Sequence, residues 1–358
     1  PVPDQSTFLK NRHGRFRESD LLRQLFESVV ARCIEEGLVG GDVFAADASI
    51  IRADANKQNA TPRQEWDPRN LDPEAVPRAV KEYLEVLDDA AFGAASEVKP
   101  KFTSHSDPAS QWTGALKGPA FFAYANNYLI DTDNAIIVDV EASRAIRQAE
   151  VGATRTMIRR TRDRFGLSPD ILAADQAYGA AENLNWLLEE EGILPHIPVI
   201  DKSKRQDGSF PNTAFTFDHE ANEYVCPGGK RLKKYWRKMT TPRSGISRDG
   251  FIRYYARKGD CSTCALKPRC TPNQPARKIA RHVYEEARDR AREIATTDAY
   301  VDTQRRRKKV EMLYAHLKRI LKLDRLRIRG PNGAKDEFHL AATAQNLRKL
   351  AKLIPQPA

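Results

Sequence analysis

The stretch ILAADQAYGAAENLNWLLEEEG, residues 171–192, joins a short strand pattern to a helical pattern. Its first residues are apolar or small and run directly into Asp175, and a glycine turn follows. Burying an ionised carboxylate costs free energy unless another group compensates its charge. A divalent metal ion would compensate it, but one carboxylate holds such an ion weakly. Asp175 is therefore expected to have partner ligands elsewhere in the chain.

A second aspartate has the same setting. Asp47 lies in VFAADAS, residues 43–49, and both aspartates follow two alanines in an apolar run. Two such strands side by side in one sheet would present both carboxylates at one point. For each residue alone, a capping or turn aspartate is the alternative, and it stays open.

The surrounding patterns predict a mixed α/β sheet. From residue 43 to residue 200 they read strand, hairpin, helix, strand, helix, strand, and that alternation is typical of α/β proteins. Helices are expected over residues 18–38 and 74–92, and a loop over residues 93–119.

The later part of the chain changes in character. A basic segment punctuated by Gly and Pro predicts a small β-rich insert, and a helical pattern returns from about residue 278. We therefore expect an N-terminal helical segment, an α/β domain in two parts around the insert, and helices that complete the domain. Their bounds are residues 1–41, 42–200, 201–277 and 278–358.

The charge balance favours a polyanionic partner. The net charge is +11 with a pI near 9.4, and residues 301–330 hold 11 Lys and Arg against 3 Asp and Glu. Clustered basic charge is typical of nucleic-acid binding; a merely soluble basic enzyme is the alternative. No apolar run approaches the roughly 20 residues of a membrane span, and the start has no apolar signal region. We expect a cytoplasmic protein.

One later helix combines acidic and basic residues on one face. In QRRRKKVEMLYAHLK, residues 304–318, Arg307, Glu311 and Lys318 are spaced i, i+4 and i+11, which places them on one face of an α-helix. A glutamate between cations suits a site where the carboxylate holds metal and the cations hold phosphate. An exposed ion-paired helix is an equal alternative from spacing alone.

Four of the five cysteines lie close together in the expected insert. Cys226, Cys261, Cys264 and Cys270 form the pattern C-x34-C-x2-C-x5-C. Disulfides are rare in the cytoplasm, and four thiolates could close a tetrahedral structural zinc site; reduced thiols without a ligand are the alternative. Cys33, within an apolar helical pattern, is interpreted as a core residue.

These motifs together resemble a bacterial insertion-sequence transposase of the DDE class, which has a ribonuclease H-like fold. Asp47 in AADAS and Asp175 in ADQAYG match the two aspartates of that family, and Glu311 matches its glutamate. In one subgroup the signature is tyrosine, two residues, arginine, three residues, glutamate, six residues, lysine. Arg307 and Lys318 fit that signature, whereas its tyrosine position is Gln304.

The resemblance implies a function. Asp47, Asp175 and Glu311 would hold two Mg²⁺ (or Mn²⁺) ions that flank a scissile phosphate, for hydrolysis and strand transfer at element ends. The resemblance also implies a truncated DNA-binding region within residues 1–41, phosphate contacts from Arg307 and Lys318, and double-stranded DNA of the terminal repeats and target as the partner. It further implies a homodimer on that DNA and a location at the bacterial nucleoid when bound. A nuclease without strand transfer and a non-catalytic DNA-binding remnant are the alternatives.

Overall fold

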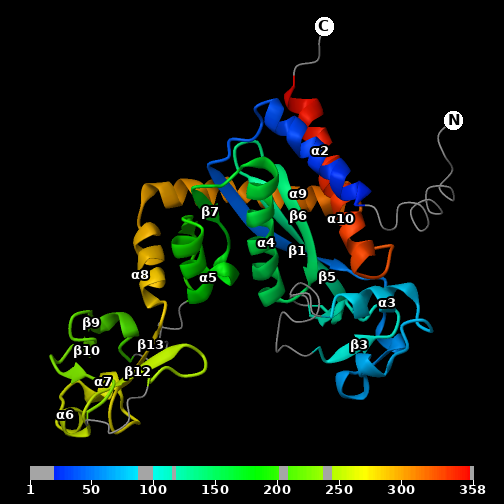
Figure 1. Cartoon of the computed structure of the whole chain (residues 1–358). Helices are drawn as coiled ribbons and strands as arrows, with labels where there is room; N and C mark the ends of the chain where they lie inside the picture. Colours follow the sequence, from blue (N-terminus) through cyan, green and yellow to red (C-terminus); the bar gives the residue numbers. More distant parts are fainter. Residues whose placement is uncertain (1–19, 88–99, 115–117, 201–208, 237–243, 355–358) are drawn as a thin grey trace, which may run out of the picture. The chain divides into compact units, whose positions relative to one another are not determined.

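A computed structural model of the chain describes residues 20–87, 100–114, 118–200, 209–236 and 244–354. The chain forms two compact units (Figure 1). Unit 1 comprises Pro1–Asp175, Gly192–Ile197 and Thr297–Ala358, and unit 2 comprises Gln176–Glu191 and Pro198–Thr296. The expected N-terminal helix is present as α2 (Leu21–Glu35), whereas residues 1–19 of the expected DNA-binding segment lie outside the described residues.

A six-stranded mixed sheet forms the centre of unit 1. Strand β1 pairs antiparallel with β5 on one side and parallel with β7 on the other, and β7 pairs parallel with β8. Strands β4 and β6 both pair antiparallel with β5. The strands are β1 (Val43–Arg52), β4 (Gln111–Thr113), β5 (Phe121–Asp131), β6 (Ile136–Arg144), β7 (Ile171–Ala173) and β8 (Leu194–His196). The core strands β1 and β5 are long because the sequence supplies near-continuous apolar and small residues there.

Helices flank this sheet. Helix α4 (Arg147–Phe165) packs on β5 and β6, α10 (Pro331–Leu353) packs on β6 and α2, and α9 (Asp298–Arg319) lies against β1, β7 and β8. The remaining elements of unit 1 are α3 (Arg78–Glu85), the two-stranded sheet of β2 (Ala60–Pro62) and β3 (Phe102–Ser104), and 3-10 turns at Lys57–Asn59, Arg63–Glu65 and Pro68–Asn70.

Local sequence signals set the helix ends. The hydroxyl of Thr297 accepts a hydrogen bond from the Tyr300 amide at 3.2 Å and so caps the N-terminus of α9. At the C-terminal end of α4, Gly166 adopts a left-handed φ of 67°, a conformation that glycine adopts without strain. Helix α10 has Pro331 at its first position, where the missing amide hydrogen costs nothing.

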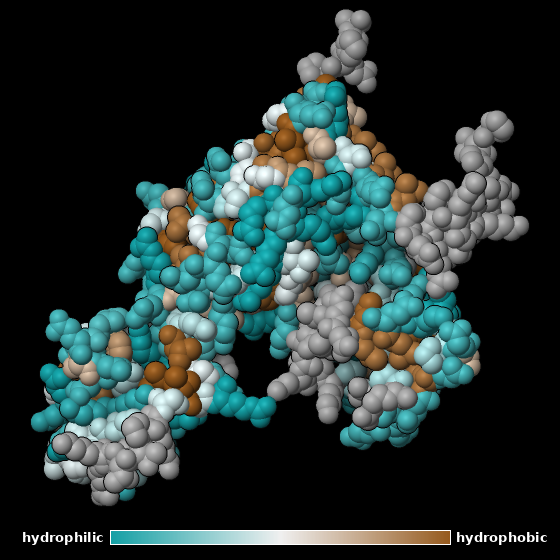
Figure 2. Space-filling model, in the orientation of Figure 1, coloured by the Kyte–Doolittle hydropathy of each residue, from teal (hydrophilic) through white to brown (hydrophobic). Residues whose placement is uncertain are grey.

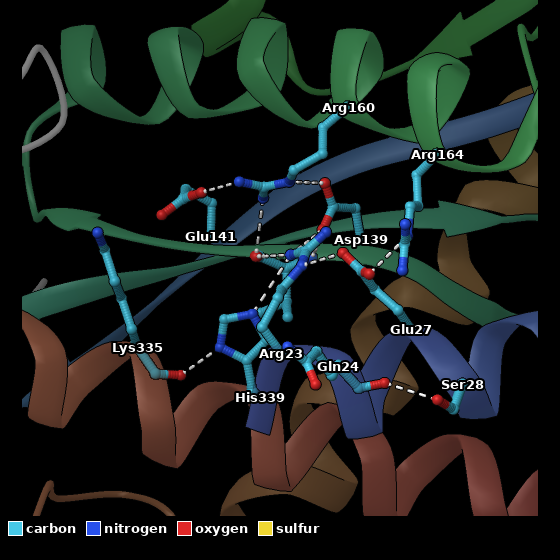
Figure 3. A network of polar contacts seen from close by, with 11 residues as sticks. Arg23, Gln24, Glu27, Ser28, Asp139, Glu141, Arg160, Arg164, Lys335 and His339 are labelled. Atoms are coloured by element: carbon cyan, nitrogen blue, oxygen red, sulfur yellow. Dashed lines mark hydrogen bonds and ion pairs between the residues drawn. The ribbon is translucent and has the colours of Figure 1, made fainter. Parts of the chain in front are cut away.

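A buried ion-pair network joins three helices to β6 (Figure 3). The carboxylate of Asp139 on β6 is 1% exposed and accepts hydrogen bonds from Arg23 of α2 at 2.6 Å and Arg160 of α4 at 2.8 Å. Arg160 also reaches Glu141 at 2.7 Å, and Arg23 contacts the imidazole of His339 on α10 at 3.3 Å. Asp139 is thus a fully paired structural carboxylate.

Unit 2 contains two small sheets and several short helices. Strands β9 (Thr216–Asp218), β10 (Glu223–Val225) and β11 (Arg231–Leu232) form one antiparallel sheet, and β12 (Phe251–Tyr255) pairs antiparallel with β13 (Lys278–His282). The helices are α5 (Ala181–Asn185), which continues as a π-helical turn (Trp186–Glu190), α6 (Lys258–Ser262), α7 (Lys267–Cys270) and α8 (Glu285–Ile294), with 3-10 turns at Gln176–Tyr178 and Asn212–Ala214.

The mixed α/β sheet with flanking helices was expected, and it is compatible with a ribonuclease H-like fold. Two local expectations are wrong. Residues 278–282 form β13 rather than the start of a helix, which begins only at Glu285, and β3 and β4 lie within the expected loop of residues 93–119. Strands β3 and β4 are only three residues long, and the partners of β3 and β13 lie more than twenty residues earlier in the sequence, so local periodicity does not reveal these strands. The helix expected over residues 74–92 is shorter, and residues 88–92 lie outside the described part.

No helix in the described ranges combines the length and apolarity that a bilayer crossing requires.

Candidate acidic site

The strand register places Asp47 and Asp175 next to each other. Strands β1 and β7 run parallel with Val43 opposite Ile171 and Ala45 opposite Ala173. Asp47 lies two residues beyond Ala45, and Asp175 lies two residues beyond Ala173, so the same register leads to both aspartates. The paired strands therefore lead to both AAD motifs, with Asp47 inside β1 and Asp175 just beyond the end of β7.

Helix α9 contacts β1 at Asp47. The hydroxyl of Tyr314 donates a hydrogen bond to the main-chain carbonyl of Asp47 at 2.6 Å and contacts the Asn126 carbonyl on β5 at 3.2 Å. Its ring stacks on Tyr128, with ring centroids 5.0 Å apart. Because Glu311 precedes Tyr314 by three residues, this contact brings the helical turn that carries Glu311 to β1.

The charges at the site act on one another. Burial raises the pKa of the Asp47 carboxyl to about 6, and the negative charges of Asp175 and Glu311 add to this shift. The Ala48 amide and the positive charge of Arg307 oppose it. The Ala48 amide donates to Oδ1 of Asp47 at 2.9 Å. Asp47 is therefore within the electrostatic reach of Asp175, Glu311 and Arg307, which come from β7 and α9.

A fourth carboxylate belongs to this neighbourhood, and the sequence interpretation missed it. Glu150 lies in the first turn of α4, and burial raises the pKa of its carboxyl to about 7, with further upward contributions from Asp175 and Asp47 and an opposing one from Arg147. Ala153, Thr154 and Met157, the positions i+3, i+4 and i+7 from Glu150, are all buried, so Glu150 lies on the buried stripe of α4. An acidic residue on the buried stripe of a helix is unusual enough to single out.

The cations of the helix motif have different surroundings. Arg307 acts on Asp47, as described, and its guanidinium contacts the Gln304 side chain at 3.3 Å. Lys318 is half-buried, and burial lowers the pKa of its ammonium against the opposing charge of Asp324. Gln304, at the signature's tyrosine position, donates its amide hydrogen bond to the His196 carbonyl at 2.8 Å and so fastens α9 to β8.

The donor chemistry of the site suits a divalent cation. Carboxylate oxygens are the ligands that Mg²⁺ and Mn²⁺ prefer, and carboxylates that raise one another's pKa are relieved by a cation between them. Among the described residues, however, these side chains are not arranged as a set of metal ligands. In the part of the chain that the structure describes, no group of three or more His, Cys, Asp or Glu is arranged to hold a metal ion.

The four clustered cysteines of unit 2 also come together. Cys226, Cys261, Cys264 and Cys270 line one cavity, and none of them is in a disulfide. The Lys230 amide donates to Sγ of Cys226 at 3.3 Å. Burial raises the pKa of the Cys270 thiol, Arg277 opposes that shift, and the other three thiols add to it. These described thiols face a common cavity, but they are not arranged as a set of metal ligands.

Residues 225–351 match the family model described as Transposase DDE domain. The matched segment contains Glu311, Arg307, Lys318 and the four clustered cysteines, and it covers about a third of the chain. No curated protein matches the chain. The match supports a DDE transposase, and it lies over the part of the sequence that contributes the glutamate of the acidic site.

Proposed function

We propose that the chain is a DNA transposase that catalyses metal-dependent phosphodiester hydrolysis and strand transfer at the ends of an insertion sequence. The observation that carries the proposal is the meeting of Asp47 and Asp175, 128 residues apart in the sequence, at the register of β1 and β7, with Glu311 acting on Asp47 from α9. The match to a transposase DDE domain supports the same reading.

The three carboxylates are assigned to the binding of two Mg²⁺ or Mn²⁺ ions. When bound, such ions supply a nucleophile at neutral pH and neutralise charge that develops on the phosphate. The chain's own part is to hold the carboxylates on a rigid frame: Asp47 within β1, Asp175 just after β7, and Glu311 on a helix fixed to β1 by Tyr314. Arg307, beside Asp47, is assigned to the scissile phosphate, and Lys318 to DNA further along α9.

The remaining assignments complete the proposal. A homodimer on paired element ends, and a location at the nucleoid when bound, agree with the basic charge of the chain. The four cysteines are assigned to a structural Zn²⁺, supported by their shared cavity and by the amide hydrogen bond to Cys226. Metal analysis of the purified protein would then find about one Zn²⁺ per chain, and Cys264→Ser would lose it.

A cleavage and joining assay tests the function. The substrate is DNA that flanks the chain's own gene, with Mg²⁺ or Mn²⁺ and a plasmid target. We expect nicked ends and joined products, and we expect Asp47→Asn, Asp175→Asn and Glu311→Gln each to lose more than about a thousandfold of the activity while DNA binding is kept.

Asp302→Asn is the matched control, because Asp302 is an exposed carboxylate on α9 that pairs with Arg306. It should leave cleavage unchanged. Cleavage that survives Glu311→Gln would refute the assignment of the glutamate. Nicking without joined products would indicate a nuclease, and DNA binding without any metal-dependent product would indicate a non-catalytic remnant.

A further inference from the structure

A second strongly basic segment of the chain lies in unit 2, outside the acidic site. Residues 230–281 contain sixteen Lys and Arg and two acidic residues, Asp249 and Asp260, a net charge of +14. This exceeds the net +8 of residues 301–330. Such a surplus costs self-repulsion unless a polyanion compensates it, so it calls for an explanation of its own.

The sheet of β12 and β13 has one face toward the core of the unit and one exposed face. Tyr254 and Ile279 lie directly opposite each other in the sheet, and both are 1% exposed within a small hydrophobic core. Because side chains alternate along a strand, the neighbouring residues point to the other face. Arg253 and Tyr255 are exposed on that face, and so is Lys278, which lies opposite Tyr255.

An exposed aromatic ring lies in the middle of a row of cations on this face. Tyr255, 41% exposed, has Lys278 opposite it on β13 and Lys233 opposite it on its other side, where the backbones of Lys233 and Tyr255 exchange hydrogen bonds of 3.0 and 2.9 Å. Directly opposite residues of antiparallel strands point to the same face. The row is therefore Lys233, Tyr255 and Lys278, with Arg253 two residues from Tyr255 on the same strand.

The cations of this face are little compensated. Lys233 pairs with Glu223 at 2.6 Å, but neither Arg253 nor Lys278 makes an ion pair with any residue that the structure describes. Beside the row, Arg257 lies over the ring of Trp236 at 4.3 Å, and the Trp236 indole donates to the Tyr255 carbonyl at 2.6 Å. In Figure 2, the lower-left part of the surface is mainly hydrophilic, with a smaller hydrophobic patch among the hydrophilic residues.

We propose that the exposed face of β12 and β13, with Arg253, Lys278 and Tyr255 at its centre, binds the phosphate backbone of duplex DNA. Unpaired cations on a rigid strand pair hold phosphates without a large loss of side-chain freedom, and a tyrosine among them adds contact to the sugar-phosphate edge. The choice of DNA as the polyanion rests on the proposed function; the exposure of Arg253 and Lys278 without an ion pair to any described residue does not.

Fluorescence anisotropy of a labelled mixed-sequence duplex tests this proposal on the full chain. The measurement uses Glu311→Gln without divalent metal, so its outcome does not depend on catalysis. The variant Arg253→Gln/Lys278→Gln should weaken binding about tenfold or more at low salt. It should also reduce the slope of log K against log salt by about 1.8, because each lost phosphate contact removes about 0.9.

Three further variants sharpen the result. Arg32→Gln/Lys352→Gln removes the same charge from exposed positions on α2 and α10 of unit 1 and should leave the slope unchanged. Arg253→Lys/Lys278→Arg keeps both charges and should bind as the parent does. Tyr255→Ser should weaken binding with the slope unchanged.

The proposal fails if the Arg253 and Lys278 variant keeps the parent slope, or if the control pair reduces the slope equally, since net charge alone would then explain binding. Because the substitutions are on exposed side chains, the thermal unfolding midpoint should stay within a few degrees of the parent value. If the wild-type chain shows no cleavage but the Arg253 and Lys278 variant still reduces the salt slope, the proposed catalysis is refuted and the DNA-binding face is retained.

Discussion

Two aspartates on neighbouring regions of the same sheet have opposite surroundings. Asp139 on β6 is buried between two arginines, with both carboxylate oxygens paired. Asp47 on β1 is partly buried beside the like charges of Asp175 and Glu311. Burial first, and then these charges, raise the pKa of its carboxyl to about 6 against the opposing charge of Arg307. Burial is common to both, so burial alone does not separate a structural carboxylate from a functional one. The identity of the neighbouring charges does.

The largest expected effect that distinguishes the two sites is on stability. Asp139→Asn leaves the guanidinium groups of Arg23 and Arg160 without their buried partner and should lower the free energy of unfolding by about 3 kcal/mol. Asp47→Asn removes a carboxylate from like charges and should leave that free energy unchanged or raise it at neutral pH. Urea unfolding of both variants measures the difference. Equal losses would mean that Asp47 is paired in the same manner as Asp139.

The pH dependence of stability should come from the acidic site. The carboxyls of Asp47 and Glu150 have pKa values of about 6 and about 7, above their usual values of 3.8 and 4.5. A carboxyl with a raised folded-state pKa binds its proton more tightly when folded, so its contribution is present at pH below about 4 and is lost as the pH rises to about 7.

Without divalent metal, the wild-type chain should therefore lose about 2 kcal/mol relative to Asp47→Asn between about pH 4 and pH 7. Urea unfolding at a series of pH values measures this difference. A difference independent of pH would show that Asp47 titrates in its ordinary range, and the like-charge account of the site would be wrong.

Glu150 offers a narrower test of the same comparison. Glu150→Gln removes one of the negative charges that act on Asp47 and Asp175, so we expect the binding of Mn²⁺ to weaken about tenfold, within the range for groups that support metal ligands. Asp163→Asn is the matched control, because Asp163 is an exposed carboxylate at the other end of α4. Calorimetric titration of both variants measures the effect, and equal affinities would exclude Glu150 from the site.

The smallest expected effect concerns the attachment of α9. Tyr314→Phe keeps the ring that stacks on Tyr128 but removes the hydrogen bond to the Asp47 carbonyl. The loss in unfolding free energy should be about 1 kcal/mol, the usual net value of one hydrogen bond, and Mn²⁺ binding should weaken with it. If Mn²⁺ binding is unchanged, the hydroxyl contributes to stability without positioning Glu311.

The sequence predicted the parts of this account that depend on local patterns. The AAD contexts of Asp47 and Asp175 indicated neighbouring strands, and the spacing of Arg307 and Glu311 indicated one helix face. Strand β13 could not be predicted in the same way, because its partner β12 lies more than twenty residues earlier. Local periodicity carries no information on such pairing.

Two site features were invisible for a related reason. Glu150 belongs to a helix rich in arginine, and only the packing of α4 on the sheet shows that Glu150 follows the buried Ala149 and precedes the buried Ala153. Tyr314 lies in the helix motif, but its role depends on the main-chain carbonyl of Asp47, 267 residues earlier. Contacts between distant segments decide both, and a single sequence does not record them.

The most direct test of the central claim is a crystal structure with Mn²⁺, in which anomalous scattering locates the metal. The account predicts a peak between the carboxylates of Asp47, Asp175 and Glu311, with the three side chains drawn together around it. A peak elsewhere, or no peak at Mn²⁺ concentrations that support cleavage, would contradict the assignment of this acidic site as the catalytic centre.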